Sequence, residues 1–249
     1  MKGADKYAQT KSHIAEIYHR HKGRYGYRRI TLELRKSGTL INHKTVQRLM
    51  GQLGLRSMVR IKKYKSYKGA VGTIAPNVLR RDFNAAMPYS KWVTDMTEFS
   101  LFGQKLYLSP ILDLYNGEII SYSISERPTF HHVMDMLDKA FDKIPQNTGL
   151  ILHSDQGWQY QMKKYQHRLK MKGVVQSMSR KGNCLDNAVM ENFFGHLKSE
   201  LLYLQKFDNI KHFVNELHDY IHYYNNHRIK EKLKGLSPVQ YRTQSFNSA

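Results

Sequence analysis

Helical periodicity marks residues 1–56. Apolar side chains recur there at spacings of three and four residues, the pattern of short amphipathic helices; they are Ile14, Ile17, Tyr18, Ile30, Leu32, Leu34, Val46, Leu49, Met50 and Leu53. Breaks at 23–26 and 37–38 separate three predicted helices, and Asn42 or Thr45 is the expected N-cap of the third. The layout is typical of a helix-turn-helix-like DNA-binding domain. A plain three-helix packing module is the alternative.

Residues 57–89 show little periodicity and are predicted to be a basic linker. The run RSMVRIKKYKSYKG interleaves cations with tyrosines. Lys62, Lys63 and Lys65 are candidates for neutralising DNA phosphates, and the tyrosine rings could stack on bases. A solvated basic tail is the alternative for this segment.

Strand-like alternation follows the linker. Three runs, KWVTDMTEFSL, KLYLSPILDLY and GEIISYSIS, have strand character, and Asn116–Gly117 between the last two is a hairpin signal. A helix over 130–141, the strands GLILHSD and VVQSMS around another helix, and a long helix capped by Asp186 come next. This order predicts an α/β fold with a mixed five-stranded sheet and flanking helices over 90–204. It matches the ribonuclease H-like layout, with a helical extension over 205–249.

Charge is unevenly distributed along the chain. The 249 residues include 40 Lys and Arg against 20 Asp and Glu, a formal net charge of +20. Residues 1–90 contain 20 of these basic residues and only 4 of the acidic ones. Such a balance indicates a polyanionic partner, most often nucleic acid. A ribosomal or chromatin-type binding protein would also be basic, but it would need no cluster of acids.

Cysteine content and hydropathy exclude several other classes. One cysteine allows neither a disulfide framework nor a Cys-rich zinc module, and it fits a reducing compartment. The first residues lack the apolar segment of a signal peptide, and the longest apolar runs are far shorter than a membrane span. We therefore expect a cytoplasmic protein with no membrane partner.

Three acidic residues stand out by position. Asp95 interrupts an apolar strand, Asp155 ends another, and Glu191 lies in the first turns of the long predicted helix. A strand carboxylate with little solvent contact is costly unless it is paired or binds a metal, and a carboxylate cluster suits Mg²⁺ or Mn²⁺. Two such ions can stabilise the attacking and leaving oxygens of a phosphodiester displacement. Each acid alone is more often a cap or turn residue.

The chain resembles the catalytic protein of two-reading-frame bacterial insertion sequences, which are transposases with an integrase-like core. The resemblance covers nearly the whole chain and rests on the segments WVTDMTEF, HSDQGWQY, SMSRKGNCLDNAVMENFFGHLKSE and YIHYYNNHRIKEKLKGLSPVQY. Asp95, Asp155 and Glu191 match the catalytic triad of that family, including the 35 residues between the last two. The chain lacks the His/Cys zinc module of retroviral integrases.

The resemblance implies a function, cofactors and partners. It implies metal-dependent DNA cleavage and strand transfer at insertion-sequence ends, with two Mg²⁺ ions per active site and Mn²⁺ as a possible substitute. The implied partners are DNA at the element ends and at the target, an upstream-frame protein or its frameshift fusion, and further copies of the chain in a dimer or larger assembly. The implied location is the bacterial cytoplasm, in association with the nucleoid.

Further candidates lie around the acids. Arg180, Lys181 and Asn183 occupy a loop before the Glu191 helix and are expected to contact DNA phosphates. Lys198 follows Glu191 by about two helical turns and is expected on the same helix face at a DNA end. A solvated surface lysine is the alternative for Lys198.

Five nearby residues are assigned supporting roles. Gly157 would let DNA approach closely, Asp186 would cap the long helix, and Glu200 would be a surface or structural acid. Asp113 suits a turn, and His153 suits a packed structural position.

Two rival functions remain at this point. A ribonuclease H-type or repair nuclease would cut without joining, although it would rarely need so basic an N-terminal region. A non-catalytic DNA-binding regulator of transposition would show no metal-dependent nicking. A strand-transfer assay with a pre-cut end separates the first rival from a transposase.

Overall fold

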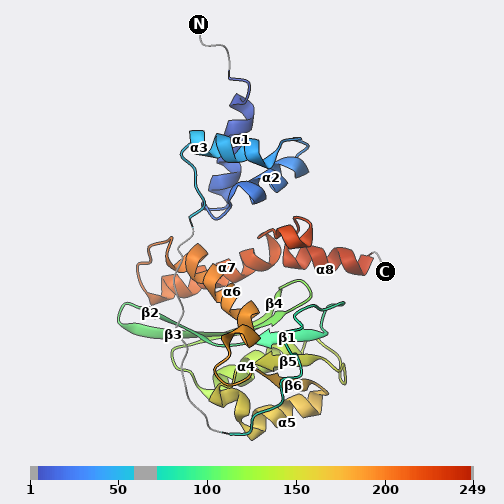
Figure 1. Cartoon of the computed structure of the whole chain (residues 1–249). Helices are drawn as coiled ribbons and strands as arrows, with labels where there is room; N and C mark the ends of the chain where they lie inside the picture. The colour runs from blue at the N-terminus through green and yellow to red at the C-terminus, as the bar shows by residue number, and fades with distance from the viewer. Residues whose placement is uncertain (1–4, 59–71, 248–249) are drawn as a thin grey trace.

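The computed structural model describes residues 5–58 and 72–247 (Figure 1). Three helices form the N-terminal domain: α1 (Ala8–Arg20), α2 (Tyr27–Lys36) and α3 (His43–Gln52). Most of the predicted apolar positions are buried together, and Ile14 and Val46 have no exposed surface, whereas Leu53 is exposed. The Asn42 side chain accepts a hydrogen bond from the backbone N–H of Lys44, so Asn42 rather than Thr45 caps α3. The three helices predicted from the periodicity are therefore present.

One mixed sheet forms the centre of the molecule. Its strands are β1 (Lys91–Thr94), β2 (Thr97–Leu101), β3 (Gln104–Asp113), β4 (Ile119–Ser125), β5 (Ile151–Ser154) and β6 (Val175–Met178). β3 pairs antiparallel with β4 along one edge and with β1 and β2 along the other. β1 pairs parallel with β5, and β5 pairs parallel with β6. This is the predicted order of an antiparallel meander followed by parallel strands.

The first predicted strand is divided in two. β1 and β2 lie end to end along one edge of β3, so the sheet is five strands wide although six strands are counted. Asp95 and Met96 separate them, and the Asp95 carboxylate accepts a hydrogen bond from the backbone N–H of Met96 at 2.7 Å. At the point where the strand is interrupted, the Asp95 side chain thus accepts the hydrogen bond that a neighbouring strand would otherwise accept from this backbone N–H.

Alternation along the strands gives each face of the sheet its own core. Val93 and Leu112 pack on one face with the side chains of α6 and α7, and Trp92 and Ile111 pack on the other with those of α4 and α5. The flanking helices are α4 (Phe130–Phe141), α5 (Lys163–Lys172), α6 (Ala188–Leu197), α7 (Ile210–Asn226) and α8 (Pro238–Asn247). Figure 1 shows α4 and α5 below the sheet and α6 to α8 above it.

Short helical turns complete the chain. They are the 3₁₀ turns η1 (Trp158–Gln161), η2 (Cys184–Asn187) and η4 (Glu231–Leu233), and the π-helical turn η3 (Lys198–Leu202). The long helix predicted from Asp186 onward is consequently shorter: it begins at Ala188 and passes into η3 after Leu197. The prediction that Asp186 caps it is wrong, because Asn187 occupies the cap position and makes no side-chain capping bond.

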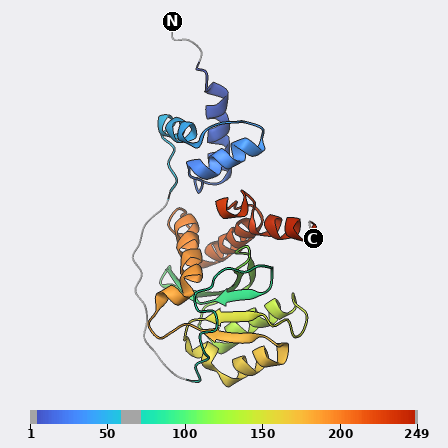
Figure 2. The same cartoon turned by 45° about the vertical axis from the view of Figure 1, so that its right-hand side comes forward.

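The N-terminal domain rests on the C-terminal helices, and both views place it beyond the layer of α6 to α8 (Figures 1 and 2). The buried Tyr25 hydroxyl donates to the carbonyl of His227 and accepts from the N–H of Ile229. The Arg24 guanidinium donates to the carbonyl of Glu200 at 3.0 Å. The helix-turn-helix-like part is therefore in direct hydrogen-bonded contact with the core. The predicted domain limits at 57, 90 and 205 stay predictions.

Candidate active site

The strand register brings Asp95 and Asp155 together. β1 and β5 are parallel partners with Val93 opposite His153, and the two aspartates follow two residues later in each strand. Neighbouring strands lie about 4.8 Å apart, so the aspartates leave the carboxyl ends of adjacent strands side by side. Ligands of open α/β sheets bind at this edge.

Backbone N–H groups orient both carboxylates. Asp95 accepts from Met96, as described above, and Asp155 accepts from the N–H of Gly157 at 2.9 Å. A Cβ atom at Gly157 would lie 2.9 Å from the Asp155 carboxylate and 2.7 Å from the Gln159 amide. Gly157 therefore gives room to the protein's own aspartate, which is a more direct role than the DNA approach expected from the sequence.

Helix α6 carries the third acid. Glu191 lies in the first turn of α6. Asn187, the last residue of the η2 turn that precedes α6, reaches the same region. The Asn187 amide donates to the carbonyl of Thr94 at 3.4 Å and hydrogen-bonds to Asp95. These contacts attach the start of α6 to the end of β1 and bring the charge of Glu191 to bear on Asp95.

Burial disfavours the ionised form of all three acids. Burial raises the pKa of Asp95 well above its ordinary value, and the negative charges of Asp155 and Glu191 raise it further. Burial also raises the pKa of Asp155 and of Glu191. The largest influences on the pKa of Asp95 include two neighbouring carboxylates and no cationic side chain.

This donor set fits a hard divalent cation. Carboxylate oxygens are the ligands that Mg²⁺ prefers, and the buried Asn187 Oδ1 has no hydrogen-bond partner within the described structure. The acids are not yet gathered into a complete ligand shell. Within residues 5–58 and 72–247, no three His, Cys, Asp or Glu side chains lie close enough together to hold one ion. The assignment of all three as metal ligands stays a prediction.

Sequence reasoning missed two residues of this site. Tyr160 in η1 is fully buried, and burial together with the charges of Asp95 and Asp155 raises the pKa of its hydroxyl well above the ordinary value. Asn187 is the other. No pattern in the chain indicated either, because both act through contacts between segments that are distant in sequence.

The predicted phosphate-binding loop is built around a buried acid. Asp186 has no exposed surface; it accepts from the backbone N–H and the guanidinium of Arg180 and pairs with Arg81 at 2.6 Å. These cations hold the pKa of Asp186 below its usual range, although burial opposes them. Arg180 keeps N–H donors for a phosphate, since a guanidinium has five. Lys181 is exposed, and the Asn183 amide oxygen accepts from Arg81.

The other sequence-predicted residues have the following positions. Lys198 is half-buried at the end of α6, with its ammonium 5.6 Å from the centre of the Phe99 ring. Lys62, Lys63 and Lys65 lie outside the described residues. DNA contact by any of these residues stays a prediction.

Three structural roles are confirmed. Asp113 is buried at its turn and accepts from the N–H of Tyr115 and from the indole of Trp92. His153 is fully buried with Nδ1 at 2.8 Å from the Ser177 hydroxyl. Glu200 is buried and ion-paired, which makes it the structural acid of the two options considered.

Comparison with known proteins places this geometry in a family. Residues 85–184 and 191–246 match the integrase core domain, and residues 5–63 match an HTH-like domain. The putative transposase InsK for insertion sequence element IS150 of Escherichia coli K12 is 59% identical over 242 residues, which cover 97% of this chain and 86% of that protein. An uncharacterized transposase-like protein of Haemophilus influenzae is 53% identical over 218 residues, 88% of this chain and all of its own length.

A solved structure supports the fold. The catalytic core domain of HTLV-2 integrase, determined in complex with magnesium, aligns with a TM-score of 0.52 at 18% identity, over 63% of this chain and 98% of its own. The fold is thus that of an integrase core preceded by a helix-turn-helix-like domain. The chain belongs to the family of insertion-sequence transposases with an integrase core. No helix in the described ranges is long and apolar enough to cross a bilayer.

Proposed function

We propose that this protein is a DNA transposase that cleaves DNA at the ends of an insertion sequence and joins the cut strand to new DNA. Its family membership supports transposition, and the aspartate pair at the ends of β1 and β5 supports the chemistry. Asp95, Asp155 and Glu191 would hold two Mg²⁺ ions, with Mn²⁺ as a possible substitute. When bound, these cations stabilise charge on the attacking and leaving oxygens of an in-line phosphodiester displacement.

The chain's own groups prepare the site. The N–H groups of Met96 and Gly157 fix the two carboxylates before any ligand arrives, so little reorganisation is needed there. The Asn187 amide holds α6 against β1 and keeps Glu191 within reach. Arg180, Lys181, Asn183 and Lys198 would position the DNA backbone around the acids, and the N-terminal helices would bind the duplex of the element end.

The assembly is also part of the proposal. Two ends must be held for one transposition event, so we propose a dimer or larger assembly on DNA, with an upstream-frame protein or a frameshift fusion contributing to end binding. The cytoplasm, in association with the nucleoid, is the proposed location.

Substitution of Asp155 tests the catalytic assignment. We expect Asp155→Asn in the full chain to lower Mg²⁺-dependent nicking of a duplex carrying the element end by at least about a thousandfold, because a neutral amide is a poor ligand for a hard cation. DNA binding in a mobility-shift assay should stay within about twofold. Asp142→Asn, at an exposed aspartate at the end of α4, is the matched control and should leave both unchanged.

The outcomes separate the rival functions. Nicking that persists in Asp155→Asn would overturn the metal assignment. A wild-type protein that nicks but does not join a pre-cut end would be a nuclease, and a protein that binds without Mg²⁺-dependent nicking would be a regulator.

A further inference from the structure

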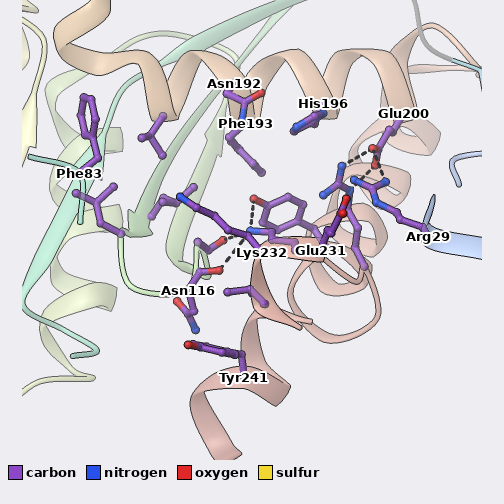
Figure 3. A pocket seen from close by; sticks show the side chains of 18 of the residues that line it. Arg29, Phe83, Asn116, Asn192, Phe193, His196, Glu200, Glu231, Lys232 and Tyr241 are labelled. Atoms are coloured by element: carbon purple, nitrogen blue, oxygen red, sulfur yellow. Dashed lines mark hydrogen bonds and ion pairs between the residues drawn. The ribbon is translucent and has the colours of Figure 1, made fainter. Parts of the chain in front are cut away.

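A cleft of about 850 Å³ separates the N-terminal domain from the core. Its walls come from α2, α6 and the segment around η4. Figure 3 shows Asn192 and His196 reaching into it from α6, with Phe83 and Arg29 on opposite sides and Lys232 between them. The cleft starts at Ala188, in the same helical turn as Glu191, but it is lined by a different face of α6.

The lining is strongly basic. Six of its residues are Lys or Arg, and two are Glu. Glu200 offsets Arg228 through two hydrogen bonds, and Glu231 lies 3.7 Å from the exposed Arg28. Lys230 donates to backbone carbonyls, and within the described part of the chain neither it nor Lys232 forms an ion pair with a carboxylate. Burial and the nearby Arg228 and Arg29 lower the pKa of Lys230 well below its ordinary value. The surplus of positive charge in the cleft therefore comes from the four arginines and Lys232, and a polyanion would neutralise it.

Flat rings and neutral polar groups accompany these cations. Tyr27 and Phe83 are half-buried in the wall, and the amide of Asn192 is exposed. Burial, followed by the charge of Arg228, lowers the pKa of His196 to about 4, so this imidazole is neutral at pH 7 and offers hydrogen bonds rather than charge. Cations that follow a backbone combined with rings on which bases can stack are typical of sites for single-stranded nucleic acid.

The cleft continues toward the third helix of the N-terminal domain. A second hollow of about 430 Å³ shares Gly26, Tyr27 and Ser57 with it and extends to Gln47 and Gly51 of α3. One hollow surface thus connects α3 of the N-terminal domain, whose helices are proposed to bind duplex DNA, with the helix that carries Glu191. A single DNA strand lying in this hollow would contact the N-terminal domain at one end and the helix that carries Glu191 at the other.

We propose that this cleft binds single-stranded DNA, with phosphates on Arg28 and Lys232 and bases against Tyr27 and Phe83. The inference rests on the proposed function, since cutting one strand at an element end leaves a duplex end whose strands can fray near the cut. A volume near the upper end of the usual range for ligand pockets, roughly 300–1,000 Å³, accommodates a short run of nucleotides. It is too small to enclose a duplex.

Binding measurements without Mg²⁺ test the cleft separately from the chemistry. The probes are a fluorescein-labelled 12-nucleotide oligothymidylate and a blunt duplex carrying the element end, each titrated with the full chain in the Asp155→Asn background. Arg28→Gln combined with Lys232→Gln changes two exposed cations. We expect about tenfold weaker binding of the single strand. The slope of log K against log salt should become about 1.4 shallower, because each phosphate contact contributes roughly 0.7 on a single strand.

Two further variants sharpen the comparison. Tyr27→Leu should weaken single-strand binding about fivefold or more through lost stacking. Lys170→Gln removes an exposed lysine of α5, on the side of the sheet away from the N-terminal domain, and should have no effect (Figure 1). Duplex binding by the double variant should stay within about twofold, and a thermal melt checks that each variant is folded.

Each outcome of these binding measurements either supports the single-strand proposal or overturns it. Single-strand affinity and salt slope that equal those of the parent in the double variant would overturn the proposal. Equal losses for duplex and single strand would also overturn it, since the cleft would then be a general duplex surface. Because no cleavage is measured, a protein that passes these tests and yet fails to nick DNA would refute the proposed function and leave the cleft assignment intact.

Discussion

Replacement of Glu200 by Gln should destabilise the whole protein. The Glu200 carboxylate is buried in η3 and receives two guanidinium hydrogen bonds from Arg228, at 2.6 and 2.8 Å, and one from the hydroxyl of Tyr220. Arg29 of α2 adds a second positive group at 3.6 Å. Figure 3 shows Glu200 and Arg29 together at one side of the cleft. Glu200→Gln keeps the shape of the side chain and leaves Arg228, itself 2% exposed, without its anion.

The magnitude follows from the ionisation of Glu200. Burial alone would raise its pKa, but the charge and hydrogen bonds of Arg228, together with Arg29, outweigh burial and lower the pKa from 4.5 to about 2. At about 1.4 kcal/mol per pKa unit, the ionised form contributes roughly 3 kcal/mol to the free energy of unfolding. Breaking a buried ion pair costs about 3–5 kcal/mol in other proteins, so we expect a loss of about 3 kcal/mol.

Urea unfolding at several pH values is the assay. A carboxylate whose pKa is lowered on folding stabilises fully above its unfolded pKa, near 4.5, and loses this effect as the pH falls toward 2. The difference between wild type and Glu200→Gln should therefore be constant from pH 7 to about 5. It should shrink by about 1.4 kcal/mol for each pH unit below 4.5. Glu16→Gln, which removes an exposed partner of Arg20, should cost less than about 1 kcal/mol.

Two results would refute this reasoning. One is a loss below about 1 kcal/mol at pH 7, and the other is a loss that is equal at pH 7 and pH 3.5. The double change Glu200→Leu with Arg228→Met should cost less than Glu200→Gln alone, since it leaves no unpaired charge on Arg228. A larger cost for the double change would show that Glu200 and Arg228 stabilise the fold chiefly through packing.

Two further predictions concern the acids. Gly157→Ala should lower the rate of Mg²⁺-dependent nicking by about tenfold or more with DNA binding retained, because the added methyl group displaces the Asp155 carboxylate; an unchanged rate would contradict this. The Mg²⁺ concentration for half-maximal nicking should rise as the pH falls from 8 to 6, because the raised pKa of Asp95 means that a proton competes with the cation. A pH-independent Mg²⁺ requirement would show that both aspartates are already fully ionised.

The sequence was sufficient for features that depend on local pattern. Alternation in the runs before Asp95 and Asp155 predicted the strands, and the apolar stripe from Val46 to Leu53 predicted α3. Both aspartates could be selected because each ends or interrupts an apolar strand, where a carboxylate is costly without a partner. The periodicity of apolar residues and the cost of burying a carboxylate are both properties of short segments. They can therefore be read directly from the sequence.

Features that depend on contacts between distant segments could not be predicted. Asp186 precedes a helix, so capping was the local expectation, whereas the fold buries it between Arg180 and Arg81. Arg81 precedes the first strand of the sheet in the chain, and Arg180 follows the last strand. Nothing in the spacing of the residues therefore indicated that Arg81 is a partner of Asp186. Asn187 and Tyr160 reach the acids for the same reason, through the packing of η2 and η1 against the ends of the central strands.

One helical run connects the two functional parts of the molecule. Glu191 lies in the first turn of α6, and Glu200, nine residues later in η3, binds Arg29 of the N-terminal domain and Arg228. α6 passes directly into the π-helical turn that contains Glu200, so Glu191 and the ion pairs of Glu200 belong to one helical segment. A substitution that breaks the ion pairs of Glu200 is therefore expected to affect the position of α6 as well as the contact with the N-terminal domain.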